Sequence, residues 1–165
     1  MTMAVENREI GSVIPYEHNP RVNDDAVDAV AASIKEFGFR TPILCDATGV
    51  IIAGHTRLKA AQKLGLKTVP VIVADDLSPE KVQALRIADN QLATLATWDE
   101  SLLALELSAL QSVDYDLSVL GFDEDELSRL LGSLDDDADE NAVVKPTELE
   151  TVQPEALMGP VSPRS

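Results

Sequence analysis

The sequence is poor in the residues that build the most easily recognised kinds of site. Cys45 is its only cysteine, which excludes a disulfide framework and a cluster of thiolate metal ligands within the chain. Aromatic residues make up 4% of the chain, so we expect a core of aliphatic side chains and alanine. No run reaches the roughly 18 apolar residues of a membrane span, and the N-terminus lacks the layout of a signal peptide. We expect no membrane association and a cytoplasmic location.

Basic residues are almost absent from one part of the chain. Residues 99–140 contain 14 acidic residues and one basic residue, Arg129, whereas residues 1–98 contain 12 acidic and 10 basic residues. Most of the net charge of −16 therefore belongs to the second part. Contacts with DNA phosphates need Lys and Arg, so this balance argues against nonspecific coating of DNA while allowing a local basic patch.

Hydrophobic periodicity predicts an α+β (mixed α/β) fold with about four short strands and interleaved helices. We expect strands at 10–14, 42–45, 50–53 and 69–73, with Pro70 marking either a sheet edge or the start of its strand. Helices are expected from residue 23 or 24 to 37, then at 55–66 and 78–93. Two further helices are expected near 97–111, opened by a capping box from Thr97 to Glu100, and at 123–131.

These elements predict three regions. Residues 1–97 form the mixed domain, and residues 98–132 form an acidic helical extension. From residue 133 the periodicity is lost, and an Asp-rich segment leads into a tail with Pro, Glu and Val. Such a composition cannot bury a core, so residues 133–165 are expected to be disordered.

The strongest local signal for a ligand site lies where a β-branched run meets a glycine and a helix. Val50 to Ala53 predict a buried strand, Gly54 breaks it, and a helix follows at once. The first amides of a helix lack intrahelical acceptors and attract anions. Thr56 can add a hydroxyl and Arg57 a two-pronged guanidinium, and Lys59, Lys63 and Lys67 continue a basic stripe. The alternative is an ordinary strand-turn-helix with a solvated lysine face.

A second polar group lies on the predicted helix 78–93. Arg86, Asp89 and Asn90 are three and four residues apart and share one face. Asp89 could hold a metal ion or orient Arg86, and Asn90 could bind a base, sugar or phosphate. The alternative is an exposed polar face with an ordinary ion pair. The candidates for catalysis are Asp89 and His55, whose neutral form is favoured at a helix start.

The order of these segments resembles the N-terminal domain of ParB-like proteins in the ParB/sulfiredoxin superfamily. The resemblance covers about residues 9 to 97 and rests on five ordered motifs: Asn19-Pro20-Arg21, Ser33-Ile34 with Phe37-Gly38 and Pro42-Ile43, Gly54-His55-Thr56-Arg57, Val69-Pro70-Val71 and Ile87-Ala88-Asp89-Asn90. The variant it resembles most is the ParB-like domain that precedes phage and prophage DNA methyltransferases. That variant also has a Trp-Asp-Glu helix and a Gly-Phe-Asp segment, which match residues 98–100 and 121–123.

The resemblance implies a nucleotide site. It places nucleotide phosphates at Gly54, His55, Thr56 and Arg57, with Arg21 as a further contact. Arg86, on the polar helix face, is our own additional candidate for nucleotide or phosphate binding. It places Asp89 and Asn90 beside the nucleotide and its magnesium. The nucleotide implied is a triphosphate, CTP or ATP.

Four departures from the family's patterns narrow the functions that the resemblance allows. ParB proteins usually have Glu-Arg-Arg after the glycine, so His55-Thr56-Arg57 carries one arginine fewer. Sulfiredoxins need a cysteine where His55 stands, which excludes sulfinic acid reduction. No cofactor motif of a methyltransferase is found in the chain. The acidic C-terminal helices also lead us to expect that the helix-turn-helix DNA reader of partition ParB is missing.

Three hypotheses follow. The chain is a nucleotide- or phosphate-binding module that serves DNA modification or DNA partition, with DNA reached directly or through a DNA-modifying partner. Alternatively it is a magnesium-dependent nuclease or nucleotide hydrolase that uses Asp89 with Asp75 or Asp76. In the third hypothesis it is an interaction module whose acidic segment binds a basic partner without any nucleotide.

Overall fold

The computed structural model describes residues 3–19, 22 and 24–137. They belong to two units, which are described separately. The first consists of residues up to Trp98 together with Ser118–Asp123, and the second of Asp99–Leu117 together with residues from Glu124 onward.

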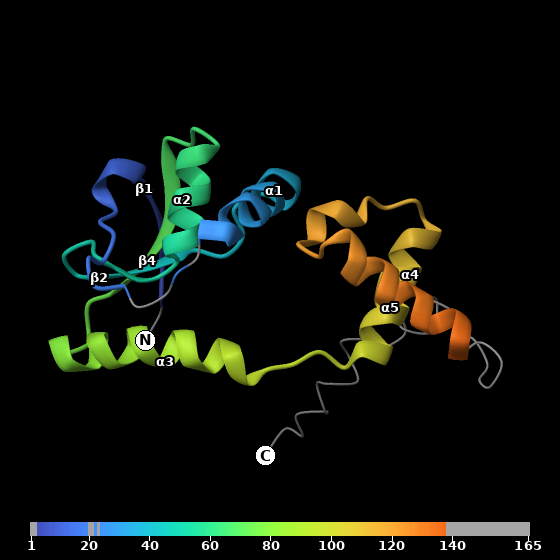
Figure 1. Cartoon of the computed structure of the whole chain (residues 1–165). Coiled ribbons are helices and arrows are strands. Elements are labelled where there is room, and N and C mark those ends of the chain that lie inside the picture. Colours follow the sequence, from blue (N-terminus) through green and yellow to red (C-terminus); the bar gives the residue numbers. More distant parts are fainter. Residues whose placement is uncertain (1–2, 20–21, 23, 138–165) are drawn as a thin grey trace, which may run out of the picture. The chain divides into compact units, whose positions relative to one another are not determined.

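The first unit is built on a four-stranded mixed sheet, which confirms the predicted fold class (Figure 1). Its strands are β1 (Val5–Glu9), β2 (Ile43–Asp46), β3 (Ile51–Ala53) and β4 (Thr68–Ala74), in the spatial order β1-β4-β2-β3. β4 runs antiparallel to β1 and parallel to β2, and β2 and β3 form an antiparallel hairpin. The apolar residues of these strands form an aliphatic core with the inner face of one helix: Val13, Ile43, Cys45, Ile51, Leu58, Ala61, Val69 and Val71.

The first unit also contains three α-helices: α1 (Val27–Phe37), α2 (His55–Lys63) and α3 (Pro79–Leu95). α2 contacts β2, α3 contacts β3, and α1 packs mainly against α2. Two 3₁₀ turns, η1 (Ile10–Ser12) and η2 (Asp24–Ala26), precede α1. α3 begins as expected, because the Ser78 hydroxyl accepts a hydrogen bond from the Lys81 amide and Pro79 takes the first helical position.

Two of the three lysines in the predicted basic stripe, those that lie on α2, form ion pairs. Lys59 pairs with Asp24 of η2, and Lys63 pairs with Asp28 of α1. These contacts join α2 to the chain segment that packs beside it. The lysine face thus remains exposed to solvent and adds two surface ion pairs between α2 and the segment beside it.

Two expectations about strands are wrong. The first strand is Val5–Glu9, and Ile10 starts the turn η1, while Ile14 makes only a single bridge to Val50. β1 was missed because it is largely exposed and shows no apolar pattern. β4 is an interior strand despite Pro70. The proline is tolerated because its register with β2 begins only at Val71, so Pro70 lies beside β1 alone.

The second unit packs α4 (Glu100–Ser112) against α5 (Glu124–Asp137), and the short 3₁₀ helix η3 (Leu117–Leu120) lies between them in sequence. Among the described residues of this unit, the buried ones are Ala104, Leu107 and Leu130. Asp99 caps α4 by accepting from the Leu102 amide at 3.1 Å, in place of the expected Thr97. α5 continues to Asp137, beyond the expected end at Leu131. Residues 138–165, most of the predicted tail, lie outside the described residues.

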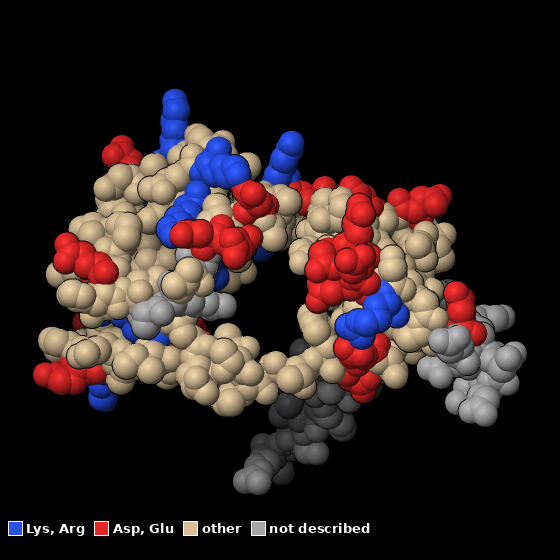
Figure 2. Space-filling view, in the orientation of Figure 1, with Lys and Arg blue, Asp and Glu red and all other residues tan. Residues whose placement is uncertain are grey.

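Acidic side chains gather on the visible face of this second unit (Figure 2). Within its described residues, Arg129 is the single basic side chain, and it pairs with Glu100 at 3.0 Å. No helix in the described part of the chain is both long enough and apolar enough to cross a membrane.

Candidate functional site

The site begins at the turn between β3 and α2. The β-branched residues Ile51 and Ile52 are buried, and Gly54 then adopts φ 116° and ψ 24°, a backbone conformation that few other residues accept. The Gly54 carbonyl accepts from the Leu58 amide at 3.0 Å, which closes the first turn of α2. The amides that start α2 therefore lie directly after the glycine, as the sequence predicts.

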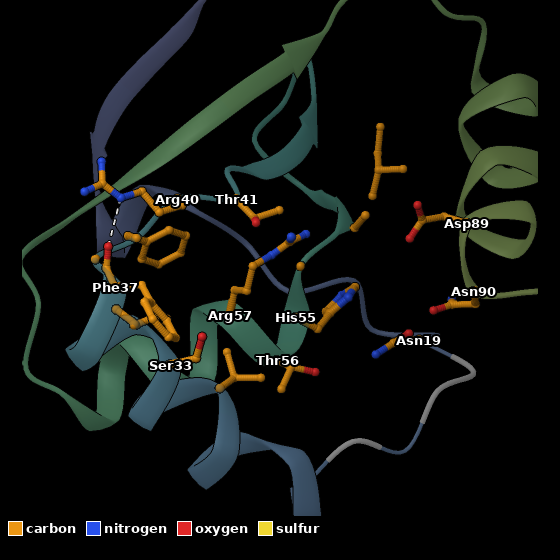
Figure 3. Close-up of a pocket in the computed structure, with 17 residues that line it drawn as sticks. Asn19, Ser33, Phe37, Arg40, Thr41, His55, Thr56, Arg57, Asp89 and Asn90 are labelled. Carbon is orange, nitrogen blue, oxygen red and sulfur yellow. Dashed lines mark hydrogen bonds between the residues drawn. The ribbon is translucent and has the colours of Figure 1, made fainter. Parts of the chain in front are cut away.

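This turn lies on the wall of a cavity of about 490 Å³, a size that suits a small organic ligand. α1 contributes one wall and α3 another, and the segment before β2 completes the lining (Figure 3). The apolar lining comes mainly from α1 and the residues after it: Val30, Ile34, Phe37 and Phe39. Polar groups come from the turn and from α3: His55, Thr56, Arg57, Asp89 and Asn90. The cavity thus has an apolar part and a polar part.

Arg57 is the main cationic group of the polar part. Its guanidinium folds back over Gly54, so that a β-carbon at position 54 would lie 2.9 Å from Nη2 and 3.0 Å from Nε. Nε is buried and has no hydrogen-bond partner among the described residues. Burial lowers the pKa of Arg57, and the charge of Asp89 partly offsets this effect. An unpaired buried donor costs free energy, so this group is prepared for an anion.

α3 supplies the opposite side of the polar part. Asp89 and Asn90 project from it toward the cavity, across from His55 (Figure 3). The Asn90 amide donates to the Arg86 carbonyl at 2.9 Å, which fixes the amide on its own helix. The structure therefore brings together six of the residues singled out in the sequence, from Gly54 to Arg57 and from Asp89 to Asn90.

Arg86, a further candidate for the phosphates in the sequence analysis, does not line this cavity. It is 8% exposed; Nε donates to the Ile51 carbonyl at 3.0 Å, and Nη2 to the Asp46 carboxylate at 3.4 Å. Its guanidinium also lies 3.9 Å from the centre of the Tyr16 ring. Partial burial acts to raise the pKa of Asp46, but hydrogen bonds from Thr48 and Val50 and the charge of Arg86 lower it below its usual value. Arg86 thus ties α3 to the sheet.

Replacing Arg86 with methionine is expected to lower the free energy of unfolding by about 2 kcal/mol. The loss follows because the buried Ile51 carbonyl loses its donor and Asp46 loses its cation. Urea unfolding followed by circular dichroism measures the change. Lys81→Met is the control, since it removes one positive charge from an exposed position of the same helix and should shift stability by less than about 0.5 kcal/mol. Equal effects of the two substitutions would contradict the structural role of Arg86.

His55 is held in its neutral form. Its Nε2 atom accepts a hydrogen bond from the Tyr16 amide at 3.1 Å, so any proton on the ring is at Nδ1. Burial lowers its pKa below the usual 6.5, and the charges of Arg86 and Lys59 lower it further. The predicted neutral state agrees with this geometry. The acceptor atom Nε2 is occupied by the Tyr16 backbone amide, so it is not offered to a ligand.

Arg40 and Thr41 line the cavity and were missed by the sequence analysis. The Arg40 Nε atom donates to the Phe37 carbonyl at 2.8 Å, at the end of α1 (Figure 3). Because β2 and β3 are antiparallel, with Leu44 opposite Ala53, the residues just before β2 lie beside the turn just after β3. Thr48-Gly49, which lies between the expected strands 42–45 and 50–53 and is typical of a hairpin turn, is the signal that could have placed Arg40 next to Gly54.

Other predicted site residues lie elsewhere. Arg21 falls outside the described residues. Asp75 and Asp76 follow β4 and do not line the cavity that holds Asp89. In the part of the chain that the structure describes, no three His, Cys, Asp or Glu side chains gather where a metal ion could bind between them.

The chain belongs to the ParB N-terminal domain family, whose model matches residues 2–91. A ParB-like nuclease domain-containing protein, YnaK of Escherichia coli (strain K12), is 43% identical over 77 residues, which are 46% of this chain and 88% of the relative. A probable chromosome-partitioning protein ParB of Campylobacter jejuni is 37% identical over 87 residues, 50% of this chain and 31% of the relative. The chain thus spans about a third of that curated partition protein.

A solved structure gives the same fold. The C-terminally truncated chromosome-partitioning protein ParB from Caulobacter crescentus, complexed with CTP-gamma-S, matches with a TM-score of 0.57 and 25% identity. The match covers 79% of this chain and 87% of that chain.

A second family model corrects the expectation that a helix-turn-helix is missing. The ParB-methyltransferase HTH domain matches residues 101–154, of which 138–154 lie outside the described residues. The expectation relied on charge. The packing of α4 and α5 depends instead on apolar residues such as Leu107 and Leu130, which tolerate acidic residues on the outer face.

Proposed function

We propose that the cavity of the first unit binds a nucleoside triphosphate, with CTP as the first candidate. Its phosphates would lie at the Gly54–Arg57 turn, and the rest of the nucleotide would extend toward the apolar wall formed by α1. The crystallised ParB relative carries a CTP analogue, which supports this choice of nucleotide.

The observation that carries the proposal is the unpaired Nε atom of Arg57. It is buried in the wall of the cavity, next to the amides of a helix start. A phosphate oxygen would supply the missing acceptor through a charge-assisted hydrogen bond. Arg40, whose Nε donates to the Phe37 carbonyl, adds a second guanidinium to the cavity lining. This arrangement favours a highly charged phosphate chain over a neutral ligand.

Magnesium fits the site as a companion of the nucleotide. Mg²⁺ commonly keeps several waters and is held by one or two carboxylates together with substrate phosphates. Asp89 is the carboxylate of the described cavity lining. Within the described residues the protein offers no cluster of three ligands, so the phosphates themselves would provide much of the coordination.

A titration of the purified chain with CTP, with and without Mg²⁺, tests the proposal by calorimetry. CTP should bind at least about tenfold more tightly than CMP, because each charge-assisted hydrogen bond to the lost phosphates is worth about 1.5 to 3 kcal/mol. ATP serves as the comparison for the base. Equal affinity for CTP and CMP would contradict phosphate recognition at the turn.

We place this module in a protein that serves DNA partition or DNA modification, of the kind that accompanies phage and prophage methyltransferases. The names of its partition relatives and the match to the ParB-methyltransferase HTH model support this role. The described part of the second unit favours contact with DNA through a partner. Its single base, Arg129, is already paired with Glu100, so it has little to offer DNA phosphates. A basic protein surface suits its acidic face better.

Nuclease or nucleotide hydrolase activity is the alternative, and the name of YnaK motivates it. A metal-dependent nuclease normally needs several carboxylates around its ions. Asp75 and Asp76 do not line the cavity with Asp89, so this alternative has less support. Product formation that requires magnesium and is abolished by Asp89→Ala would favour the enzyme over the binding module.

A further inference from the structure

Residues 14–19 form a loop that is attached at several points and ends on the wall of the cavity. Ile14 is fixed to the hairpin, since its amide donates to the Gly49 carbonyl at 2.9 Å and its carbonyl accepts from the Ile51 amide at 2.8 Å. Asn19 is the residue of this loop that lines the cavity, and its backbone amide donates to the Tyr16 carbonyl at 3.3 Å. The position of Asn19 therefore depends on Tyr16.

Tyr16 is held by contacts with two residues, His55 and Arg86. Its amide donates to Nε2 of His55, the first residue of α2. Its ring lies under the guanidinium of Arg86, 3.9 Å from the ring centre, and Arg86 is itself fixed by Ile51 and Asp46. One hydrogen bond and one cation–π contact thus join the loop to α2 and α3.

We propose that His55 and Arg86 are positioning residues for nucleotide binding, which hold Tyr16 and thereby Asn19 against the cavity, and that protonation of His55 releases this loop. The proposal rests on the proposed nucleotide site and adds its regulation by pH. The hydrogen bond exists only while Nε2 carries no proton. A protonated ring would present an N–H to the Tyr16 N–H, two donors facing each other, and the contact would be lost.

The charges and the burial around His55 determine in which direction its pKa is shifted, and so at which end of the pH range the loop is released. Arg86 from α3 and Lys59 from α2 disfavour its protonation, and so does burial. The Asp46 carboxylate accepts hydrogen bonds from the Thr48 and Val50 amides and pairs with Arg86. The charge of Asp89 raises the pKa of Arg57. Glu17 and His18 belong to the loop itself and are exposed, and Asp24 is paired with Lys59. Because the pKa of His55 in the folded chain lies below its usual value, the loop is held at neutral pH and is released only when the pH falls through that lowered pKa.

The first test needs no nucleotide. In the free protein, the amide resonance of Tyr16 should shift with the same midpoint as the imidazole nitrogens of His55 when the pH is lowered from about 7.5 to about 5. A Tyr16 amide that does not follow His55 would overturn the proposal. This measurement stays informative even if no nucleotide binds, so it separates a failure of the loop contact from a failure of the proposed function.

The second test compares CTP affinity of the wild type and of His55→Gln over the same pH range. Glutamine offers an oxygen near the place of Nε2 but does not titrate. Wild-type affinity should fall roughly tenfold more than that of His55→Gln, which corresponds to losing one hydrogen bond. The terminal phosphate of the nucleotide also takes up a proton near about pH 6, but this effect is common to both proteins and cancels in the comparison.

Tyr16→Leu keeps the backbone amide and removes the ring that contacts Arg86. This variant should weaken CTP binding throughout the pH range and leave the pH dependence in place. The comparison therefore separates the cation–π contact with Arg86 from the hydrogen bond to His55. Identical pH profiles of wild type and His55→Gln would overturn the proposal. Absence of CTP binding at every pH would overturn the proposed function together with this control of affinity.

Discussion

Replacing Arg57 with methionine is expected to weaken CTP binding by about a hundredfold or more and to leave the fold intact. The guanidinium supplies charge-assisted hydrogen bonds that a thioether cannot replace, each worth about 1.5 to 3 kcal/mol. The free energy of unfolding should stay the same or rise slightly, because the substitution removes a buried donor that has no partner among the described residues. Calorimetry measures the affinity, and urea unfolding measures the stability.

Lys35→Met is the matched control for this variant. Lys35 is exposed on α1 and does not line the cavity, so its loss changes the net charge by the same amount without touching the site. Its affinity for CTP should remain within about twofold of wild type, since an exposed charge is largely screened by salt. An Arg57→Met variant that binds CTP as well as Lys35→Met would refute the placement of the phosphates.

Replacing Gly54 with alanine is expected to lower the free energy of unfolding by about 2 to 3 kcal/mol and to abolish CTP binding. Alanine is strained at a φ of 116°. Its methyl group would also lie 2.9 Å from Arg57 Nη2 and 3.2 Å from the Ile43 side chain. Arg57 can move away, but it then leaves the position that we assign to phosphate binding. Thermal unfolding and CTP titration together measure both effects.

Gly65→Ala is the control that separates the backbone strain of a positive φ from the steric clash expected in Gly54→Ala. Gly65 also has a positive φ, 71°, yet a β-carbon there would meet nothing within 4 Å. The expected cost is about 1 kcal/mol, the usual strain of a left-handed residue, and CTP affinity should not change. Loss of nucleotide binding in both glycine variants would point to a general effect of destabilisation and would contradict the specific role of Gly54.

The sequence predicted the site best where a local pattern carried the information. The β-branched run before Gly54 and the polar helix face with Asp89 and Asn90 were each recognised, and the structure places them around one cavity. Their recognition depended on motifs only a few residues long. The start of α3 at Ser78-Pro79 was predicted for the same reason.

Features that depend on tertiary contacts were not predicted. Arg86 shares a helix face with Asp89, but its long side chain passes to the Ile51 carbonyl and Asp46, 35 and 40 residues away in sequence. Arg40 reaches the cavity only through the pairing of β2 with β3. β1 is exposed along most of its length, so its pairing with β4 leaves no apolar pattern in the sequence. The acidic charge of α4 and α5 likewise says nothing about how their inner faces pack.

The β2–β3 hairpin contains an irregularity whose influence extends beyond the sheet. Leu44 lies opposite Ala53, whereas Cys45 lies opposite Ile51, so Ile52 is an additional residue in β3. Such a bulge bends its strand and redirects the residues that follow. Here those residues are Gly54 and the start of α2, while Arg40 arrives from the partner strand. The inserted Ile52 therefore acts on the turn that carries Arg57, which makes strand geometry one determinant of how the cavity receives a ligand.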